Sequence, residues 1–242
     1  MPYTFIITQQ EYNFILQNRK TLLINYEIQE VDCQQCKKEH PSNSKKIDVH
    51  AKVSILNSFY STRVTVDSMV DNIIKQATYN DLEKNLNSGK PEAVQKIAIV
   101  GTKDNFSFAT KYCALMQPDK YPIYDSLVWL FLTELKNKGF FSKVTMKKFA
   151  KVNKNRSRAY QEYVDIYDEF INKSGIKPFY KNYHEVDKFI WGACEMYIFL
   201  EKKSKHTSIK PGSQWLSSFS SSLLAQLTST AIWNILSLII KL

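Results

Sequence analysis

The sequence predicts a mainly α-helical protein, and three observations lead to this fold class. Apolar residues recur at helical spacing in most of the segments that precede residue 206. The 242 residues include only 6 glycines and 7 prolines, which is few for the many turns of an all-β sandwich. Hydrophobic residues make up 44% of the chain, so it can bury a sizeable core in one large domain or in two small ones.

Helical spacing and helix-end signals place the expected elements in order. A short helix is expected over 9–18, then a strand or a buried helical turn over 21–28, and then a polar loop over 33–46. Further helices are expected over 48–61, from 67, from 80 or 81, and over 91–99, 106–116, 125–138, 160–172 and 186–200. We therefore divide the chain into an N-terminal segment with a polar loop (1–47), a helical domain (48–205) and a C-terminal apolar helix (206–242).

The charge of the chain favours a polyanionic partner, and DNA is the expected one. The net charge is +10, and nine basic residues with no acidic residue lie between Leu135 and Gln161. Lysines held beside phosphates release condensed counterions, so this basic stretch predicts a salt-sensitive DNA surface with Lys147, Lys148 and Lys151 as phosphate contacts. The alternative is a solvated loop, although a merely solvated face usually mixes charges of both signs.

Cys33-x-x-Cys36 is the pattern closest to a metal site, because two cysteines at this spacing can bind zinc. His40 and His50 follow at irregular spacing without a second such cysteine pair. We therefore expect two free thiols and no metal or cofactor, with zinc or a redox pair as the alternatives. The N-terminus lacks a basic region followed by an apolar stretch, so a reducing cytoplasm is the expected compartment.

Polar clusters in three segments suggest a functional site. Residues 55–63 (ILNSFYSTR) interrupt the apolar helix expected over 48–61. Its polar members are Asn57, Ser58, Tyr60 and Ser61. Residues 97–113 (IAIVGTKDNFSFATKYC) contain a tight turn between two helices, and residues 121–126 (YPIYDS) precede the next helix.

Together these segments resemble the helix-hairpin-helix DNA glycosylase superfamily, nearest to its 8-oxoguanine DNA glycosylase-like branch, over residues 48–200. In that family a helix with a polar cluster enters the opened DNA, and a hairpin with a Gly-x-Gly turn binds phosphate through backbone amides. A Pro-x-Asp motif supplies the catalytic aspartate, and in lysine-bearing members an amine attacks the sugar. The resemblance implies a helical, glycosylase-like domain that binds DNA and cleaves the N-glycosidic bond of a modified base.

The match to the family motifs is partial. Pro122 and Asp125 resemble the proline and the catalytic aspartate, with one additional residue between them. Gly101 and the neighbouring Lys103 resemble the hairpin, but the second hairpin glycine is missing. Where the family carries its nucleophilic lysine this chain has Phe106–Ser107, and Lys111 follows one turn later.

The same residues also have interpretations that need no DNA chemistry. Asp125 suits a plain helix N-cap, or a carboxylate that stabilises a developing sugar cation. Lys111 lies among apolar residues, where a lysine either becomes a nucleophile or extends its amine to solvent. Tyr124 could stack on an everted base, or it could belong to the core.

The C-terminal segment 213–240 has a different composition from the rest of the chain. The 18 residues from Leu223 to Ile240 carry no charge, and their apolar residues recur every four positions. That length barely spans a bilayer, and the polar content is high for a helix that faces lipid. Self-association or a bound partner, a membrane tail, and packing on its own domain all remain open.

Two functions from different classes fit these observations. The first is a DNA-binding, base-excision enzyme of DNA repair, a hydrolase with Asp125 and Lys111 as catalytic residues. The second is a non-catalytic interaction protein, such as an antiviral defence or toxin effector, whose C-terminal helix drives oligomerisation or membrane attachment. The basic stretch and Asp125 favour the enzyme, whereas the missing lysine and hairpin glycine favour the interaction protein.

Overall fold

The structure is a computed structural model that describes residues 6–22 and 24–206. These residues form eleven α-helices, one 3-10 helix and one two-stranded antiparallel hairpin, which confirms the prediction of a mainly α-helical protein. The apolar helix expected over 206–242 lies outside the described residues, except for His206, which ends the last described helix.

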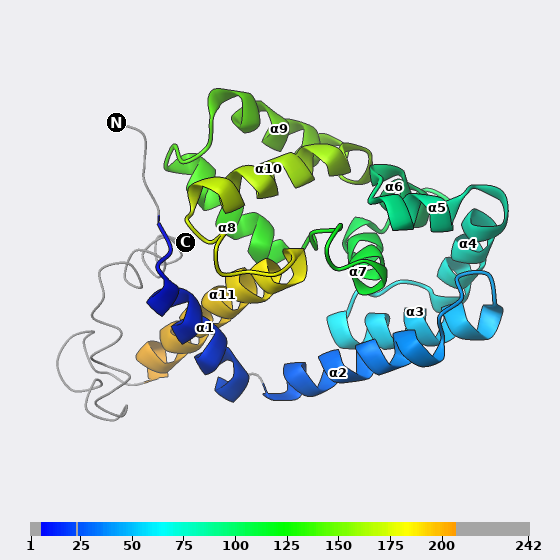
Figure 1. Ribbon diagram of the computed structural model, residues 1–242, viewed down its shortest axis with the longest axis horizontal. Coiled ribbons are helices and arrows are strands. Elements are labelled where there is room, and N and C mark those ends of the chain that lie inside the picture. Colours follow the sequence, from blue (N-terminus) through cyan, green and yellow to red (C-terminus); the bar gives the residue numbers. More distant parts are fainter. Residues whose placement is uncertain (1–5, 23, 207–242) are drawn as a thin grey trace.

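The helices form two lobes, which Figure 1 shows side by side. The first lobe contains α2 (Ile24–Glu39), α3 (Lys46–Tyr60), α4 (Val66–Tyr79), α5 (Leu82–Ser88), α6 (Pro91–Ala98), the strands β1 (Ile99–Val100) and β2 (Lys103–Asp104), and α7 (Phe106–Met116). The second lobe contains α1 (Gln9–Leu22), α8 (Ser126–Asn137), α9 (Lys143–Lys154), the 3-10 helix η1 (Ser157–Ala159), α10 (Tyr160–Lys173) and α11 (Tyr183–His206).

Packing within each lobe follows from the apolar faces of its helices. In the first lobe α3 packs against α2, α4 and α7, and α6 packs against α7. In the second lobe α9 packs against α10, while α11 packs against both α8 and α1. The first and last described helices therefore meet in the second lobe, and the first lobe is inserted between α1 and α8. The long helix α2 lies along one side of the first lobe, next to α3, and its first residues lie near α1 of the second lobe (Figure 1).

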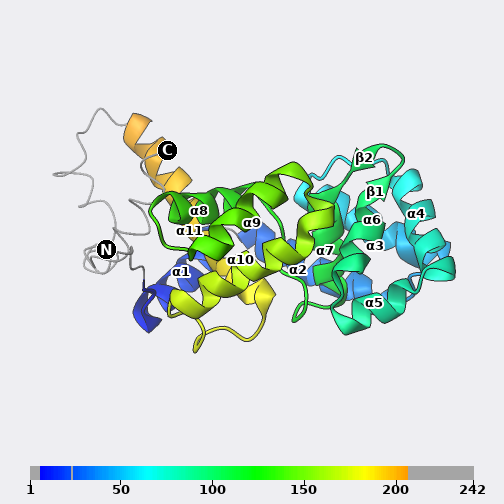
Figure 2. The same ribbon diagram turned by 90° about the horizontal axis from the view of Figure 1, so that it is seen from above.

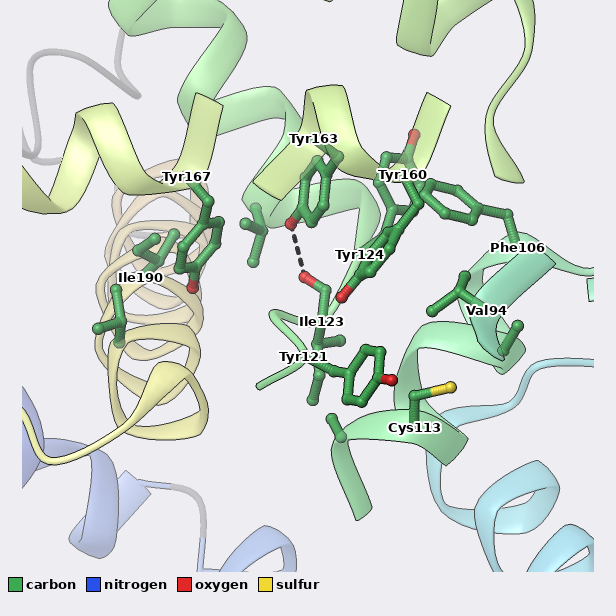
Figure 3. Close-up of a cluster of buried hydrophobic side chains, with 14 of the residues drawn as sticks. Val94, Phe106, Cys113, Tyr121, Ile123, Tyr124, Tyr160, Tyr163, Tyr167 and Ile190 are labelled. Carbon is green, nitrogen blue, oxygen red and sulfur yellow. Dashed lines mark hydrogen bonds between the residues drawn. The ribbon is translucent and has the colours of Figure 1, made fainter. Parts of the chain in front are cut away.

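Residues 117–125, which we call the seam segment, join α7 to α8 between the two lobes. Tyrosine hydroxyls hold it in place: Tyr160 of α10 donates to the Pro122 carbonyl at 3.0 Å, and Tyr163 donates to the Ile123 carbonyl at 2.6 Å (Figure 3). Both tyrosines are fully buried, and burial raises the pKa of each hydroxyl well above its usual value. A buried hydroxyl needs a hydrogen-bond partner, so these bonds fix the segment that leads to α8.

Two stretches fold differently from the sequence-based expectation. The polar loop expected from residue 33 is helical as far as Glu39, because Cys33 and Cys36 lie one turn apart and are buried. The basic stretch contains the helix α9, which the sequence analysis did not predict. Its buried face is formed by Thr145, Phe149 and Val152 at helical spacing, but the many intervening lysines obscure this pattern in the sequence.

Candidate functional site

Lys111 and Asp125, the two predicted catalytic residues, meet between the lobes. Lys111 Nζ of α7 lies 3.3 Å from Asp125 Oδ2 at the start of α8. The other carboxylate oxygen, Oδ1, accepts a hydrogen bond from the Leu127 amide at 2.9 Å and so caps α8. The structure therefore confirms the helix cap, while the second oxygen faces the amine of Lys111.

The Lys111 amine is enclosed by polar and aromatic groups. Its side chain is 3% exposed, whereas that of Asp125 is 23% exposed. The amine donates to Ser107 Oγ at 2.8 Å and lies 4.8 Å from the centre of the Tyr60 ring at the end of α3. Helical side chains point back toward the preceding turn, so the amine of Lys111 lies beside Ser107, one turn earlier.

Hydrogen bonds between α7 and the seam segment position Asp125. The Tyr124 amide donates to Thr110 Oγ1 at 3.0 Å, and Ser107 Oγ lies 3.2 Å from the Tyr124 carbonyl to which it donates. Ser107 thus contacts both the amine of Lys111 and the backbone next to Asp125. The sequence analysis did not identify Thr110 or Ser107 as site residues, although the serine stands where the resemblance would place a lysine.

A small cavity adjoins the amine of Lys111. Its volume is about 20 Å³, and its lining includes Tyr60 from α3, Gln34 from α2 and His184 from α11. This volume holds a single water molecule, and it is far below the roughly 300 Å³ of a typical ligand pocket. Lys111 lines this cavity, whereas Asp125 does not.

A second charged cluster connects α2 to α11, and two of its members, Glu30 and His184, also line this cavity. Glu30 Oε1 of α2 lies 2.7 Å from His184 Nε2 of α11 and also forms an ion pair with Lys188. Burial alone would raise the pKa of Glu30, but the hydrogen bonds and charges of His184 and Lys188 lower it to about 2. Glu30 therefore remains ionised and ties α2 to α11. The sequence offered no signal for this cluster, because Glu30 lies 154 residues before His184.

The predicted DNA-contacting residues of α3 lie at the end of that helix rather than in its middle. Asn57 uses its amide within the following loop: Oδ1 accepts from Thr62 Oγ1 at 2.9 Å and from the Val64 amide at 3.1 Å. Ser58 and Ser61 are exposed. Ser61 has a left-handed backbone with φ 49°, which costs a non-glycine residue free energy.

The turn that contains Gly101 forms the β1–β2 hairpin between α6 and α7. Gly101 has φ 60°, and no atom lies close enough to obstruct a side chain there, so its left-handed backbone is the reason for glycine. Lys103 is exposed on the second strand. Asn105 closes the hairpin, since its backbone amide donates to the Ala98 carbonyl at 2.8 Å.

The lysines of α9 do not form one uniform cationic face. Lys148 pairs with Asp165 at 2.5 Å and Lys151 pairs with Glu162 at 3.0 Å, and both acids belong to α10. Lys147 is exposed, and no ion pair to it occurs among the described residues. The stretch that is free of acids in the sequence therefore receives two acids from its neighbouring helix.

Two further predictions concerned Tyr124 and the cysteine pair. Tyr124 is 8% exposed and packs against Phe106 and Tyr163, as its core interpretation expects. Burial raises the pKa of Cys33 to about 12 and also raises the pKa of Cys36, so neither thiol is prone to ionise. Within residues 6–22 and 24–206, no group of three histidine, cysteine or acidic residues could hold a metal ion.

Comparisons with known proteins found a match to a family model and a similar protein. The family model HI_0787_N, described as an N-terminal domain, matches residues 9–120. An uncharacterized protein of Haemophilus influenzae is 31% identical over 143 residues, which cover 57% of this chain and 62% of that protein. The chain thus matches less than two thirds of this relative's length. No solved structure matches the chain.

The family match has a boundary that is relevant to the site. It includes α1 to α7, and with them Tyr60 and Lys111, but it ends before Asp125. In the described part of the chain, no helix has the length and apolar character needed to cross a bilayer.

Proposed function

We propose that this protein binds DNA and removes a modified base, with Lys111 as the nucleophile and Asp125 as the carboxylate that assists it. The observation that carries the proposal is the Lys111–Asp125 pair, 3.3 Å apart and next to the Tyr60 ring, in a protein with a net charge of +10. A buried amine in contact with a partly exposed carboxylate is suited to proton transfer and covalent catalysis.

The proposed reaction is an exchange of bonds at C1′ of the sugar. Asp125 accepts a proton from the Lys111 ammonium, and the freed amine bonds to C1′ while the bond from C1′ to the base breaks. The bonding electrons leave with the base, which takes up the proton from Asp125. Asp125, again a carboxylate, takes a second proton from the nitrogen that is now bonded to C1′. The lone pair so freed expels the ring oxygen, solvent protonates that oxygen, and the resulting iminium joins Lys111 to the sugar.

Tyr60 must move before this reaction can occur. Its ring lies over the amine, and the cavity of about 20 Å³ has no room for a sugar or a base. Tyr60 is the last residue of α3 and precedes the loop in which Ser61 and Arg63 have left-handed backbones. Such conformations are often found at sites that change shape when a ligand binds. We therefore propose that the end of α3 is displaced when DNA enters.

Borohydride trapping tests the proposal directly. The full-length protein is incubated with duplexes that each carry one oxidised, alkylated or deaminated base, and borohydride is then added. Only an amine nucleophile yields a reducible iminium, so a covalent complex is expected with at least one duplex and not with undamaged DNA. Lys111→Gln should abolish the complex, whereas Lys84→Gln, which alters an exposed lysine on α5, should leave it unchanged.

The non-catalytic alternative has one structural observation in its favour. The closed cavity beside Lys111 and the engagement of its amine by Ser107 and Tyr60 also suit a purely structural pair. In that case the protein would bind DNA without forming a covalent complex on any modified duplex. Strong duplex binding together with no trapping and no base release would establish this alternative and refute the enzyme.

A further inference from the structure

The hairpin β1–β2 is tied to η1, which precedes α10. Asp104 Oδ2 on the second strand accepts hydrogen bonds from the Ser157 amide at 3.3 Å and from Ser157 Oγ at 3.1 Å. On the other side of η1, Gln95 of α6 donates to the Arg158 carbonyl at 3.4 Å. These bonds bring η1 of the second lobe against the hairpin of the first lobe, and Figure 2 shows α9 and α10 next to that lobe.

Four cations next to this junction differ from Lys148 and Lys151, because they have no acidic partner among the described residues. Lys103, Lys154, Arg156 and Arg158 are exposed, and none of the four has an ion pair within the described part of the chain. The nearest acid on the hairpin, Asp104, is already engaged by Ser157. We call these four residues the junction cations. Their charge is therefore available to a partner, whereas Lys148 and Lys151 are neutralised by α10.

The junction cations border the segment that carries Asp125. The first turn of α10 follows directly after Arg156 and Arg158, and Tyr160 in that turn holds the Pro122 carbonyl at 3.0 Å. The charge of Arg156 also acts on Tyr124, because it opposes the rise that burial causes in the pKa of that hydroxyl. A strand bound at the junction would thus pass close to the residue before Asp125.

We propose that the junction cations, and above all Arg156 and Arg158, form the main phosphate-contacting surface for the DNA strand that enters the Lys111–Asp125 site. This inference rests on the proposed function, because it assigns the strand to that site. In the sequence alone, Lys148 and Lys151 are as good candidates for phosphate contacts as the junction cations, but in the structure both lysines pair with acids of α10. Arginine suits this role because its planar guanidinium binds a phosphate with two parallel hydrogen bonds.

The test compares two charge reversals in the full-length protein. Arg156→Glu with Arg158→Glu alters the junction, and Lys148→Glu with Lys151→Glu is the matched control on α9. Binding to a fluorescent undamaged duplex is measured by anisotropy over a series of salt concentrations. Each lost phosphate contact lowers the salt slope by about 1, so the junction variant should lose about 2 in slope and at least about tenfold in affinity at moderate salt. The α9 control should lose less than half as much.

Several other results of this experiment would contradict the inference about the junction cations. An unchanged slope in the junction variant, or an equal loss in the α9 control, overturns the inference while the proposed function stands. If the unaltered protein binds no DNA, the proposed function fails and the inference fails with it. Tighter binding to an RNA duplex of equal length would assign the surface to RNA instead and would also refute the inference.

Two additional variants separate charge from folding. Arg156→Lys with Arg158→Lys preserves the charge, so the salt slope should be retained while affinity falls only a few-fold. Circular dichroism and the melting temperature should match those of the unaltered protein in both arginine variants, because both arginine side chains are exposed. For the α9 control, which loses its ion pairs to α10, affinity is normalised to folded protein. At saturating DNA, the junction variant should still be trapped through Lys111, which distinguishes a lost binding surface from a lost nucleophile.

Discussion

Two charged clusters connect the lobes, and they differ in how completely their charges are compensated. Glu30 faces both His184 and Lys188, and its pKa of about 2 reflects this strong compensation. Lys111 has one carboxylate at 3.3 Å, a hydroxyl and the face of an aromatic ring. The first arrangement suits a permanent connection between α2 and α11, whereas the proposed function requires the Lys111 amine to give up its partners when a substrate binds.

The largest expected effect comes from Asp125→Asn. The amide oxygen can still cap α8, but the amide nitrogen then faces the Lys111 amine and cannot accept from it, so the free energy of unfolding should fall by about 1–3 kcal/mol. Without the carboxylate, no base is present to accept the ammonium proton, and base release should fall by about 10²–10³-fold. Single-turnover release of the modified base, normalised to folded protein, provides the measurement. Full activity in this variant would reduce Asp125 to a helix cap.

Glu30→Gln should have the opposite effect to Asp125→Asn, because it should lower stability and leave the reaction at Lys111 intact. Removing this anion leaves His184 and Lys188 without their shared partner at a site with little exposure, which should lower the free energy of unfolding by about 3 kcal/mol. Trapping through Lys111 should persist in the folded fraction. Glu162→Gln, which breaks the exposed pair with Lys151, is the matched control and should cost under about 1 kcal/mol. Denaturant unfolding distinguishes the two variants, and equal losses would contradict the proposed role of Glu30.

Acid should weaken the Glu30 cluster in a defined pH window. The folded-state pKa of Glu30 is lowered from its ordinary value of 4.5 to about 2. Its stabilisation is therefore complete above the unfolded-state pKa and is lost as the pH falls through the folded-state pKa. The stability difference between the unaltered protein and Glu30→Gln should shrink steadily from about pH 5 to pH 2. A difference that does not change with pH would show that Glu30 does not titrate as described.

The smallest expected effect concerns the Tyr60 ring. Contact between a buried cation and an aromatic face contributes about 1–2 kcal/mol, so Tyr60→Ala should raise the reactivity of the Lys111 amine toward a small acylating reagent by about tenfold. Tyr60→Phe keeps a ring and should react like the unaltered protein. Mass spectrometry of labelled peptides measures the rate at Lys111. Equal rates in all three proteins would show that Tyr60 does not shield the amine.

Local patterns predicted most of the helices, and the family resemblance singled out Lys111 and Asp125, but neither supplied the contacts that bring the two residues together. The helix over 106–116 agrees with α7, and Asp125 caps α8, because apolar spacing and capping residues are properties of short segments. The approach of Lys111 to Asp125 depends on hydrogen bonds from Thr110 and on tyrosines that lie far along the chain, such as Tyr163. No short window of sequence contains that information.

Charge patterning was less informative, because acidic partners can come from any neighbouring helix. The stretch from Leu135 to Gln161 contains no acid, yet Asp165 and Glu162 neutralise two of its lysines. Its helix was hidden for a related reason, since Phe149 and Val152 are separated by lysines whose stems cover the surface. Side-chain pairing across α9 and α10 has to be known before a basic stretch can be interpreted as a DNA surface.

The packing of α1 against α11 determines how late in synthesis the second lobe can be completed. The ribosome releases α1 first, but its partner α11 begins only at Tyr183. At about 5–20 residues per second, α1 waits roughly 10 to 30 seconds for that partner. The first lobe, α2 to α7, is continuous in the chain and can fold during this interval. Asp125 reaches its position only after α10 supplies the tyrosines that hold the seam segment, so a nascent chain carries Lys111 long before that amine has its carboxylate partner in place.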